Sequence, residues 1–137
     1  MIIVSACLAG KNCRFDGSSK PNSKILDLMK TEDILLVCPE ELGGLPVPRT
    51  PSEIIGEHVI SIDGLDRTKE FNTGAKLALK IALDSNCSNA ILKSKSPSCG
   101  CGLIYDGTFT GKLIEGDGIF TKLLKKNKIL VKTEKEI

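Results

Sequence analysis

The residues best suited to chemistry gather in one short stretch, residues 93–102. It reads Lys-Ser-Lys-Ser-Pro-Ser-Cys-Gly-Cys-Gly and follows an apolar segment, 89–92, that predicts a buried strand. Glycine lets the backbone approach a ligand closely, and proline fixes one backbone angle. A thiol in such a loop, directly after a strand, is well placed for catalysis or for binding a metal.

Two further cysteines stand at the ends of apolar segments. Cys7 follows 2–6, and Cys38 follows 34–37. Short continuous apolar runs are typical of parallel strands that are covered on both faces. Ligands of such sheets bind at the carboxyl ends of the strands. If the three segments are neighbouring strands, Cys7, Cys38 and Cys99 converge on one site.

Three converging thiols suit several kinds of site. A structural zinc site takes four ligands, and the fourth would be one of three residues: Cys101, Cys13 or His58. However, the usual Cys-x-x-Cys pairs are missing, which also disfavours a redox pair. An iron–sulfur cluster normally has four cysteine ligands, so three would leave one iron open to substrate. The remaining alternative is that the cysteines are small buried apolar residues.

Polar residues accompany these cysteines. Glu40 and Glu41 follow Cys38, and one of them is a candidate proton donor or acceptor. The hydroxyls of Ser96 and Ser98 bind substrate or stabilise their loop. Arg49 is a candidate substrate-binding residue that pairs either with an anion or with a carboxylate of the fold.

The long polar loop at 8–20 favours a functional role because such loops are uncommon inside compact domains. It contains Cys13 and Asp16, and we expect Asp16 to contact substrate. Cys87 ends a predicted helix and is expected to be structural. The single histidine, His58, is expected to be structural or exposed.

The elements alternate between strands and helices. A first helix is predicted from residue 22, with apolar positions 25, 26, 28 and 29. A second is predicted over 68–83, with Thr68 as its N-cap, and a third over 119–126. The loop at 39–51 has four prolines and predicts neither helix nor central strand. We expect a helical turn at 52–55, a strand or hairpin arm at 58–64, a hairpin at 103–113 and a final strand at 128–131.

This order predicts a small α/β fold in one domain, residues 1–137. Its mainly parallel, Rossmann-like sheet would be flanked by helices, with the site at the C-terminal ends of the strands. The 137 residues are 41% hydrophobic, enough for one core, and the net charge is +2. Aromatic residues make up 4%, which disfavours a stacking platform for nucleic acid.

No segment is long and apolar enough to cross a membrane, and the N-terminus lacks the features of a signal peptide. A cytoplasmic location is therefore expected. In that compartment, six cysteines favour metal binding or catalysis over disulfides.

Three motifs resemble a known bacterial family. The first combines Ser-Ala-Cys-Leu-Ala-Gly at 5–10 with Cys-Arg-Phe-Asp-Gly at 13–17. The second combines Cys-Pro-Glu at 38–40 with Gly-Gly-Leu at 43–45 and Pro-Arg at 48–49. The third is the segment 92–100. Segments 71–75 and 116–118 agree as well. The sequence is similar to the domain-of-unknown-function family that includes the iron–sulfur-dependent thiouracil desulfidases.

The resemblance implies a [4Fe–4S] cluster held by Cys7, Cys38 and Cys99, which aerobic preparation can remove. It implies that the open iron takes the sulfur of a thiolated base, such as 2-thiouracil, and that water replaces the sulfur without net redox change. Glu40 and Ser96 match the residues expected to transfer protons or activate substrate. The alternatives are a sensor or structural module that binds zinc or a cluster without catalysis, and a metal-free thiol enzyme or sulfur carrier.

Overall fold

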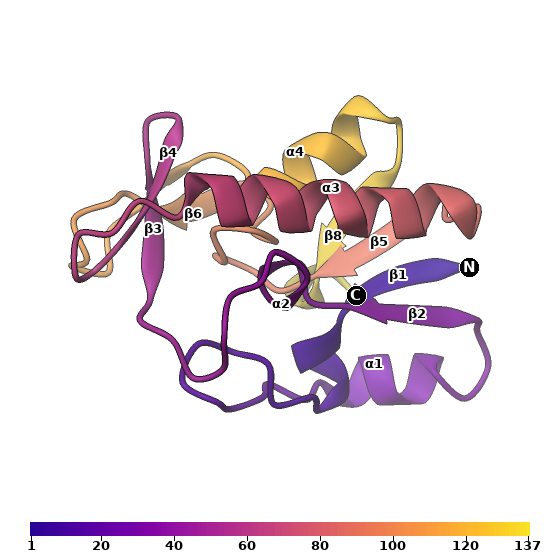
Figure 1. Cartoon of the computed structure of the whole chain (residues 1–137). Coiled ribbons are helices and arrows are strands. Elements are labelled where there is room, and N and C mark those ends of the chain that lie inside the picture. The colour runs from indigo at the N-terminus through magenta and orange to yellow at the C-terminus, as the bar shows by residue number, and fades with distance from the viewer.

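The computed structural model describes residues 1–137 and centres on a four-stranded, wholly parallel sheet in the order β2-β1-β5-β8 (Figure 1). The strands are β1 (Ile2–Ser5), β2 (Ile34–Val37), β5 (Asn89–Leu92) and β8 (Leu130–Thr133). In the register, Val4 of β1 lies between Leu36 and Ile91. The expected α/β architecture with a mainly parallel sheet is confirmed.

Two helices cover one face of the sheet: α3 (Thr68–Asp84) and α4 (Ile119–Lys126) (Figure 1). The apolar residues of α3 recur every three or four positions, so one side of the helix faces the sheet. This layer holds a core of twelve buried residues, which includes Ala75, Ala78, Phe120 and Leu124. Each large side chain buried here contributes about 1.5–3 kcal/mol to folding.

The opposite face is covered by the one-turn 3₁₀ helix η1 (Ala6–Ala9) and the short helix α1 (Ser23–Leu28) (Figure 1). Asn22 caps α1, because its Oδ1 accepts hydrogen bonds from the amides of Lys24 (3.0 Å) and Ile25 (3.3 Å). Ile25 then packs into a second buried cluster together with Val4 and Ile91 of the sheet. The loop between η1 and α1 runs along the carboxyl ends of the strands.

Two antiparallel hairpins complete the fold beyond the carboxyl ends of the central strands. They pair β3 (Ser52–Ile55) with β4 (His58–Ser61), and β6 (Leu103–Tyr105) with β7 (Leu113–Glu115). A third buried cluster joins the hairpins to α3. A 3₁₀ turn, η2 (Glu134–Glu136), follows β8.

The structure corrects three local predictions. Segment 52–55 is a strand and not a helical turn, because each of its residues pairs with the strand 58–61. Pro39 opens a one-turn helix, α2 (Pro39–Leu42), within the loop that was expected to contain no helix. Proline is tolerated at the first helical position, where its missing N–H would have no partner anyway. Thr68 lies inside α3, and its hydroxyl accepts a hydrogen bond from the Val59 amide.

Two glycines bring α2 against α3. A Cβ on Gly74 would lie 1.8 Å from the Pro39 carbonyl oxygen, and one on Gly43 would lie 2.0 Å from the Glu70 carbonyl oxygen. No larger residue fits either position without moving the backbone. The contact therefore fixes α2, and with it Cys38 and Glu40, relative to the longest helix.

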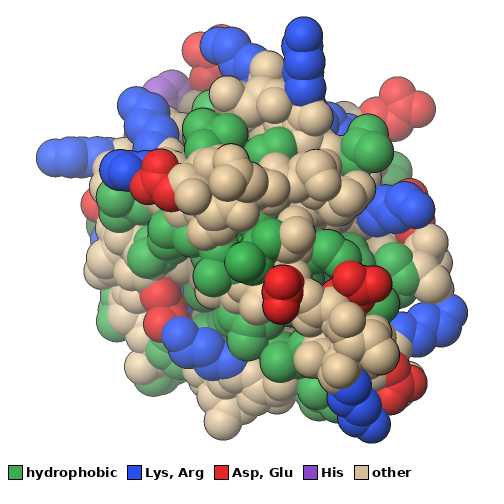
Figure 2. All heavy atoms as spheres, turned by 90° about the vertical axis from the view of Figure 1, so that its right-hand side faces the viewer, with side chains coloured by type: hydrophobic (Ala, Val, Ile, Leu, Met, Phe, Trp, Pro, Cys, Tyr) green, Lys and Arg blue, Asp and Glu red, His purple; other side chains and the backbone are tan.

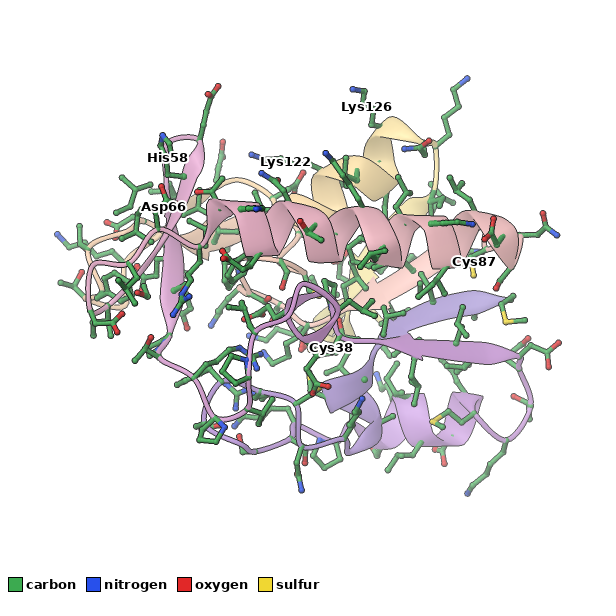
Figure 3. All side chains as sticks on the ribbon, in the orientation of Figure 1. Cys38, His58, Asp66, Cys87, Lys122 and Lys126 are labelled. Carbon is green, nitrogen blue, oxygen red and sulfur yellow. The ribbon has the colours of Figure 1, made fainter.

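The molecular surface carries charges of both signs. Figure 2 shows the end of the molecule near the N-terminus, where acidic and basic side chains are interspersed with apolar ones. The lysines of α4 that Figure 3 labels, Lys122 and Lys126, extend away from the protein body. None of the helices combines the length and the hydropathy that crossing a bilayer requires.

Candidate functional site

A cavity of about 490 Å³ opens at the carboxyl ends of β1, β2 and β5. Its wall includes the three cysteines that follow these strands, Cys7, Cys38 and Cys99. Cys7 lies in η1, Cys38 is the N-cap of α2, and Cys99 lies in the loop after β5. Because the three strands are adjacent and parallel, their following residues meet at one edge of the sheet.

The loop that carries Cys99 is held by side-chain hydroxyls. The Ser96 Oγ accepts hydrogen bonds from the Ser98 amide (3.2 Å) and the Cys99 amide (3.0 Å). The buried Thr121 hydroxyl donates to the Cys99 carbonyl at 2.9 Å. The position of the thiol is therefore fixed from both sides of its peptide.

The N-terminus of α4 holds the same loop through main-chain contacts. The amides of Ile119 and Phe120 donate to the carbonyls of Pro97 and Ser98, both at 2.9 Å. These amides are among the four that have no partner within a helix. A Cβ on Gly118 would lie 2.5 Å from the Ser98 carbonyl oxygen, so the close approach requires glycine there.

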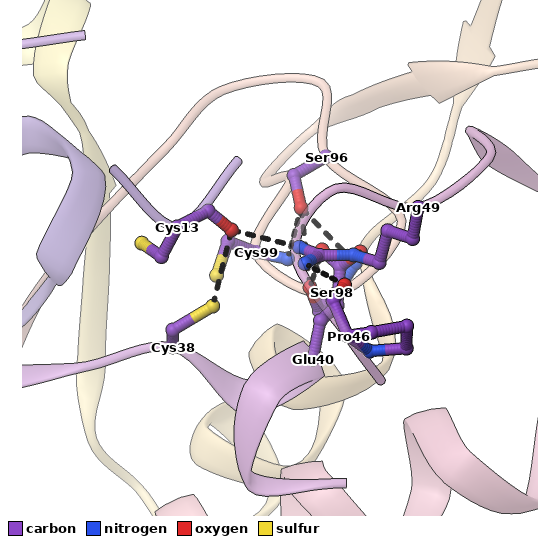
Figure 4. A network of polar contacts seen from close by, with 8 residues as sticks. All are labelled: Cys13, Cys38, Glu40, Pro46, Arg49, Ser96, Ser98 and Cys99. Carbon is purple, nitrogen blue, oxygen red and sulfur yellow. Dashed lines mark hydrogen bonds and ion pairs between the residues drawn. The ribbon is translucent and has the colours of Figure 1, made fainter. Parts of the chain in front are cut away.

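Glu40 connects to both serines of the Cys99 loop (Figure 4). The Ser98 hydroxyl donates to Glu40 Oε2 at 2.9 Å, and the Ser96 and Ser98 hydroxyl oxygens are 3.2 Å apart. Since Ser98 donates to the carboxylate, its oxygen accepts from Ser96. This arrangement is a continuous path for a proton from Ser96 to Glu40.

Arg49 holds Glu40 on its other side. Its Nε donates to Glu40 Oε1 at 3.2 Å, Nη1 to the Pro46 carbonyl at 3.0 Å and Nη2 to the Cys13 carbonyl at 2.9 Å. The Arg49 side chain is 7% exposed. The expected pairing with a carboxylate of the fold is therefore present, and the guanidinium is engaged by protein groups on three sides.

Two thiols of the site, those of Cys38 and Cys99, have raised pKa values and resist ionisation. Burial raises the pKa of Cys99 to about 12. Contact with the Cys13 thiol, together with burial, raises the pKa of Cys38. Thiols in this state release their protons when a metal binds, because the cation favours the thiolate.

The cavity also includes Cys13, a residue that the sequence did not assign to one role. Cys13 is 2% exposed and lies beside Cys7 and Cys38, although sequence reasoning left its role open. The Cys38 thiol lowers the pKa of Cys13, but contact with Cys7, burial and the Glu41 charge together raise it to about 11. Its place in the long polar loop was the available signal.

The cavity has further lining residues to which the sequence analysis assigned no role. They come from four separate loops and hairpin segments and are aromatic or basic: Arg14, Phe15, Lys93, Lys95, Tyr105 and Phe109. Aromatic rings beside polar groups are typical of pockets for small flat molecules.

Other candidate residues lie away from the cavity. Asp16 is exposed, and its pKa is lowered because its carboxylate accepts hydrogen bonds from Ser18. The Cys101 thiol faces the Val131 carbonyl at 3.9 Å. His58 pairs with Asp66 at 3.3 Å on the hairpin, and Figure 3 shows both residues far from Cys38. Cys87 belongs to the buried core next to the sheet.

The donor atoms present fit an iron–sulfur cluster with three protein ligands. Sulfur is the donor that iron–sulfur clusters and other thiophilic metals prefer. The three thiols come from three separate chain segments and surround a cavity, so a bound cluster would keep one side open. A closed zinc site with a fourth ligand from Cys101 or His58 is not possible here, because neither lies at the cavity.

Comparison with known proteins identifies the family. The model of the 2-thiouracil desulfurase family matches residues 2–136. This chain belongs to that family. The Bacillus subtilis protein YbbK, described as uncharacterised, is 42% identical over 147 residues, which cover all of this chain and 97% of that protein. Among solved structures, the [4Fe-4S]-dependent thiouracil desulfidase TudS superposes with a TM-score of 0.94 at 46% identity, over 99% of this chain and 91% of that one.

Family membership supports a desulfidase function and agrees with the resemblance seen in the sequence. The superposition with TudS covers 99% of this chain, so the shared fold includes the strand ends and the loops that form the cavity.

Proposed function

We propose that this protein is an iron–sulfur-dependent desulfidase that replaces the sulfur of a small thiolated compound, such as 2-thiouracil, by oxygen from water. The observation that supports this most strongly is the meeting of Cys7, Cys38 and Cys99 around one cavity with the Glu40 network beside it. The relative TudS is described as [4Fe-4S]-dependent and as acting on thiouracil.

In this proposal, Cys7, Cys38 and Cys99 hold a [4Fe–4S] cluster. When bound, the cluster supplies an iron with an open coordination position, a Lewis acid that attracts sulfur and draws electrons from the C=S bond. The thiols give up their protons to solvent as the cluster is bound.

The protein groups handle the water and its protons. Glu40 acts as the general base and receives a proton from an attacking water through Ser96 and Ser98. Both hydroxyls already lie in line toward the carboxylate. The overall reaction is C=S plus water giving C=O plus hydrogen sulfide, so no oxidant or reductant is consumed.

Arg49 and Ser98 were expected to bind substrate, and their contacts support a positioning role as well. Arg49 keeps Glu40 oriented, and Ser98 carries the proton between Ser96 and Glu40. Asp16 is the weakest of the proposed substrate contacts, since it does not line the cavity. The rings of Phe15, Tyr105 and Phe109 offer apolar surface for a flat heterocycle.

The test is turnover of 2-thiouracil by anaerobically reconstituted protein in ¹⁸O-labelled water. We expect uracil and sulfide in equal amounts, with the label in the new carbonyl group. Cluster-loaded protein that releases neither product would favour the alternative of a sensor or structural module. A colourless reconstituted protein without iron would contradict the cluster assignment itself.

A further inference from the structure

The site contains a second set of possible metal ligands, of which the proposed function leaves Cys13 and Glu41 unused. The Cys13 thiol, the Cys38 thiol and a carboxylate oxygen of Glu41 all lie within 4.8 Å of one another. The Cys7 thiol contacts Cys13. Cys7 and Cys13 are 7% and 2% exposed, whereas Cys38 and Glu41 are half-buried, so two ligands lie within the fold and two border the solvent.

We propose that Cys7, Cys13, Cys38 and Glu41 form a mononuclear site for a thiophilic divalent cation of the zinc class. Two of these ligands, Cys7 and Cys38, also belong to the set assigned to the cluster. The cation and the cluster therefore exclude each other, a statement that rests on the proposed function. The cation site itself does not depend on it.

The donor set matches the chemistry of zinc. Three thiolates and one carboxylate make four ligands, the number that a tetrahedral zinc site uses. With Zn–S distances near 2.3 Å, ligand atoms in a tetrahedron lie ~3.8 Å apart, so the donor atoms of Cys13, Cys38 and Glu41 need to close in by only ~1 Å. Two basic residues offset the negative charge: Arg49 at the Cys13 carbonyl and Lys11 beside Glu41.

The fold brings these ligands together through two short segments. Cys38 is the N-cap of α2 and Glu41 is the third residue of that helix, so they lie on the same side of one turn. Cys13 is held over them, because its carbonyl accepts from Arg49 (2.9 Å) and from the Cys38 thiol (3.8 Å). The Lys11–Glu41 pair spans 3.5 Å and Lys11 is 57% exposed, so this pair yields easily to a cation.

The two sets differ in their remaining ligands. The cluster requires Cys99, whose thiol lies beside the hydroxyls of Ser5 and Ser98. The mononuclear site requires Cys13 and Glu41. Single substitutions at these positions therefore separate the two sites.

The experiment is an anaerobic titration of the iron-free full-length protein with Co²⁺, followed by displacement with Zn²⁺. Tetrahedral Co²⁺ reports thiolate ligands through its visible and charge-transfer bands. We expect one Co²⁺ per chain. Cys13→Ser should weaken binding at least ~100-fold and reduce the charge-transfer bands, whereas Glu41→Gln should weaken it ~10-fold and leave those bands unchanged.

The matched variant is Cys99→Ser, which should bind Co²⁺ within about twofold of the wild type. Cys87→Ala controls for the loss of a buried thiol, and circular dichroism checks the fold. Should Cys13→Ser fail to fold, Glu41→Gln alone decides. The proposal is overturned if Cys13→Ser or Glu41→Gln binds Co²⁺ as the wild type does, or if Cys99→Ser weakens binding as much as Cys13→Ser.

Reconstitution of the same variants with iron and sulfide keeps the two proposals apart. Cys99→Ser should take up no cluster, while zinc-loaded wild type should take up less than about a tenth of the iron of zinc-free protein. A wild type that binds Co²⁺ but never takes up iron contradicts the proposed function and leaves the cation site standing. Undiminished iron uptake by zinc-loaded protein contradicts the proposal that the cation and the cluster share Cys7 and Cys38 as ligands.

Discussion

The carboxylate of Glu40 is held from two sides, by Arg49 at Oε1 and by Ser98 at Oε2. One partner fixes the orientation of the carboxylate, and the other links it to the cavity through Ser96. At the scale of single residues, the catalytic proposal therefore depends on the charge and the position of this carboxylate.

Glu40→Gln should retain the cluster and lose activity. The amide keeps the shape of the side chain but accepts no proton, and general-base catalysis contributes about 10²–10⁴-fold to rates. Iron content and sulfide release from 2-thiouracil are the measurements, with Glu41→Gln as the matched control. Turnover within a few-fold of the wild type would exclude Glu40 as the base.

Arg49→Lys tests the positioning role. Lysine keeps the charge but cannot reach Glu40 and the two carbonyls of Pro46 and Cys13 together. We expect a loss of about 1–3 kcal/mol in the free energy of unfolding and a fall in kcat of about tenfold, with KM less affected. Denaturant unfolding and steady-state kinetics measure both. An increase in KM alone would instead identify Arg49 as a substrate ligand.

The raised pKa of Cys99 predicts how the metal-free protein reacts with alkylating agents. The thiol is protonated below its pKa of about 12, so the reactive thiolate fraction keeps rising as the pH rises. Pulse alkylation followed by mass spectrometry should show a rate at Cys99 that still increases between pH 9 and pH 10. The alkylation rate of free cysteine, whose pKa is near 8.5, levels off over the same pH range. A plateau for Cys99 below pH 9 would contradict the prediction.

At the scale of elements, two contacts set the geometry of the site. The N-terminus of α4 holds the Cys99 loop through the Pro97 and Ser98 carbonyls, and the glycine contact between α2 and α3 fixes Cys38 and Glu40. The site is therefore positioned by helices that contribute none of their own side chains to the cavity, with the exception of α2.

Gly74→Ala should disturb both the fold and the site. The added Cβ would lie 1.8 Å from the Pro39 carbonyl oxygen, so α2 has to move away from α3. Overpacking of this kind typically costs about 1–3 kcal/mol. The melting temperature and the iron uptake of Gly74→Ala should both fall. Lys76→Ala, at an exposed position of the same helix, should leave both unchanged. An unaltered melting temperature for Gly74→Ala would refute the close contact.

At the scale of the whole molecule, the sequence predicted the parallel sheet and the meeting of three thiols. The apolar runs before Cys7, Cys38 and Cys99 identified the strands, and parallel neighbours place their ends together. The hairpin at 103–113 and the helix at 119–126 were also predicted, and the hairpin's second strand ends two residues later than expected. The final strand spans Leu130–Thr133 and so lies two residues later than the predicted 128–131.

The remaining differences come from long-range contacts. Segment 52–55 becomes a strand only because it pairs with 58–61, and local propensity did not reveal that partner. Cys13 reaches the cavity because its loop folds back over α2 and is held by Arg49, 36 residues away. Contacts between distant segments leave no periodic signal in a single sequence, so the proximity of Cys13 to Cys38 was not predicted.

The measurement that bears most directly on the central claim is the iron content and visible spectrum of anaerobically reconstituted cysteine variants, each assayed for sulfide release from 2-thiouracil. We predict that serine at position 7, 38 or 99 abolishes the brown chromophore, the bound iron and turnover together. Cys87→Ala and Cys101→Ala should retain all three. A Cys99→Ser protein that still binds iron and releases sulfide at the wild-type rate would contradict the account.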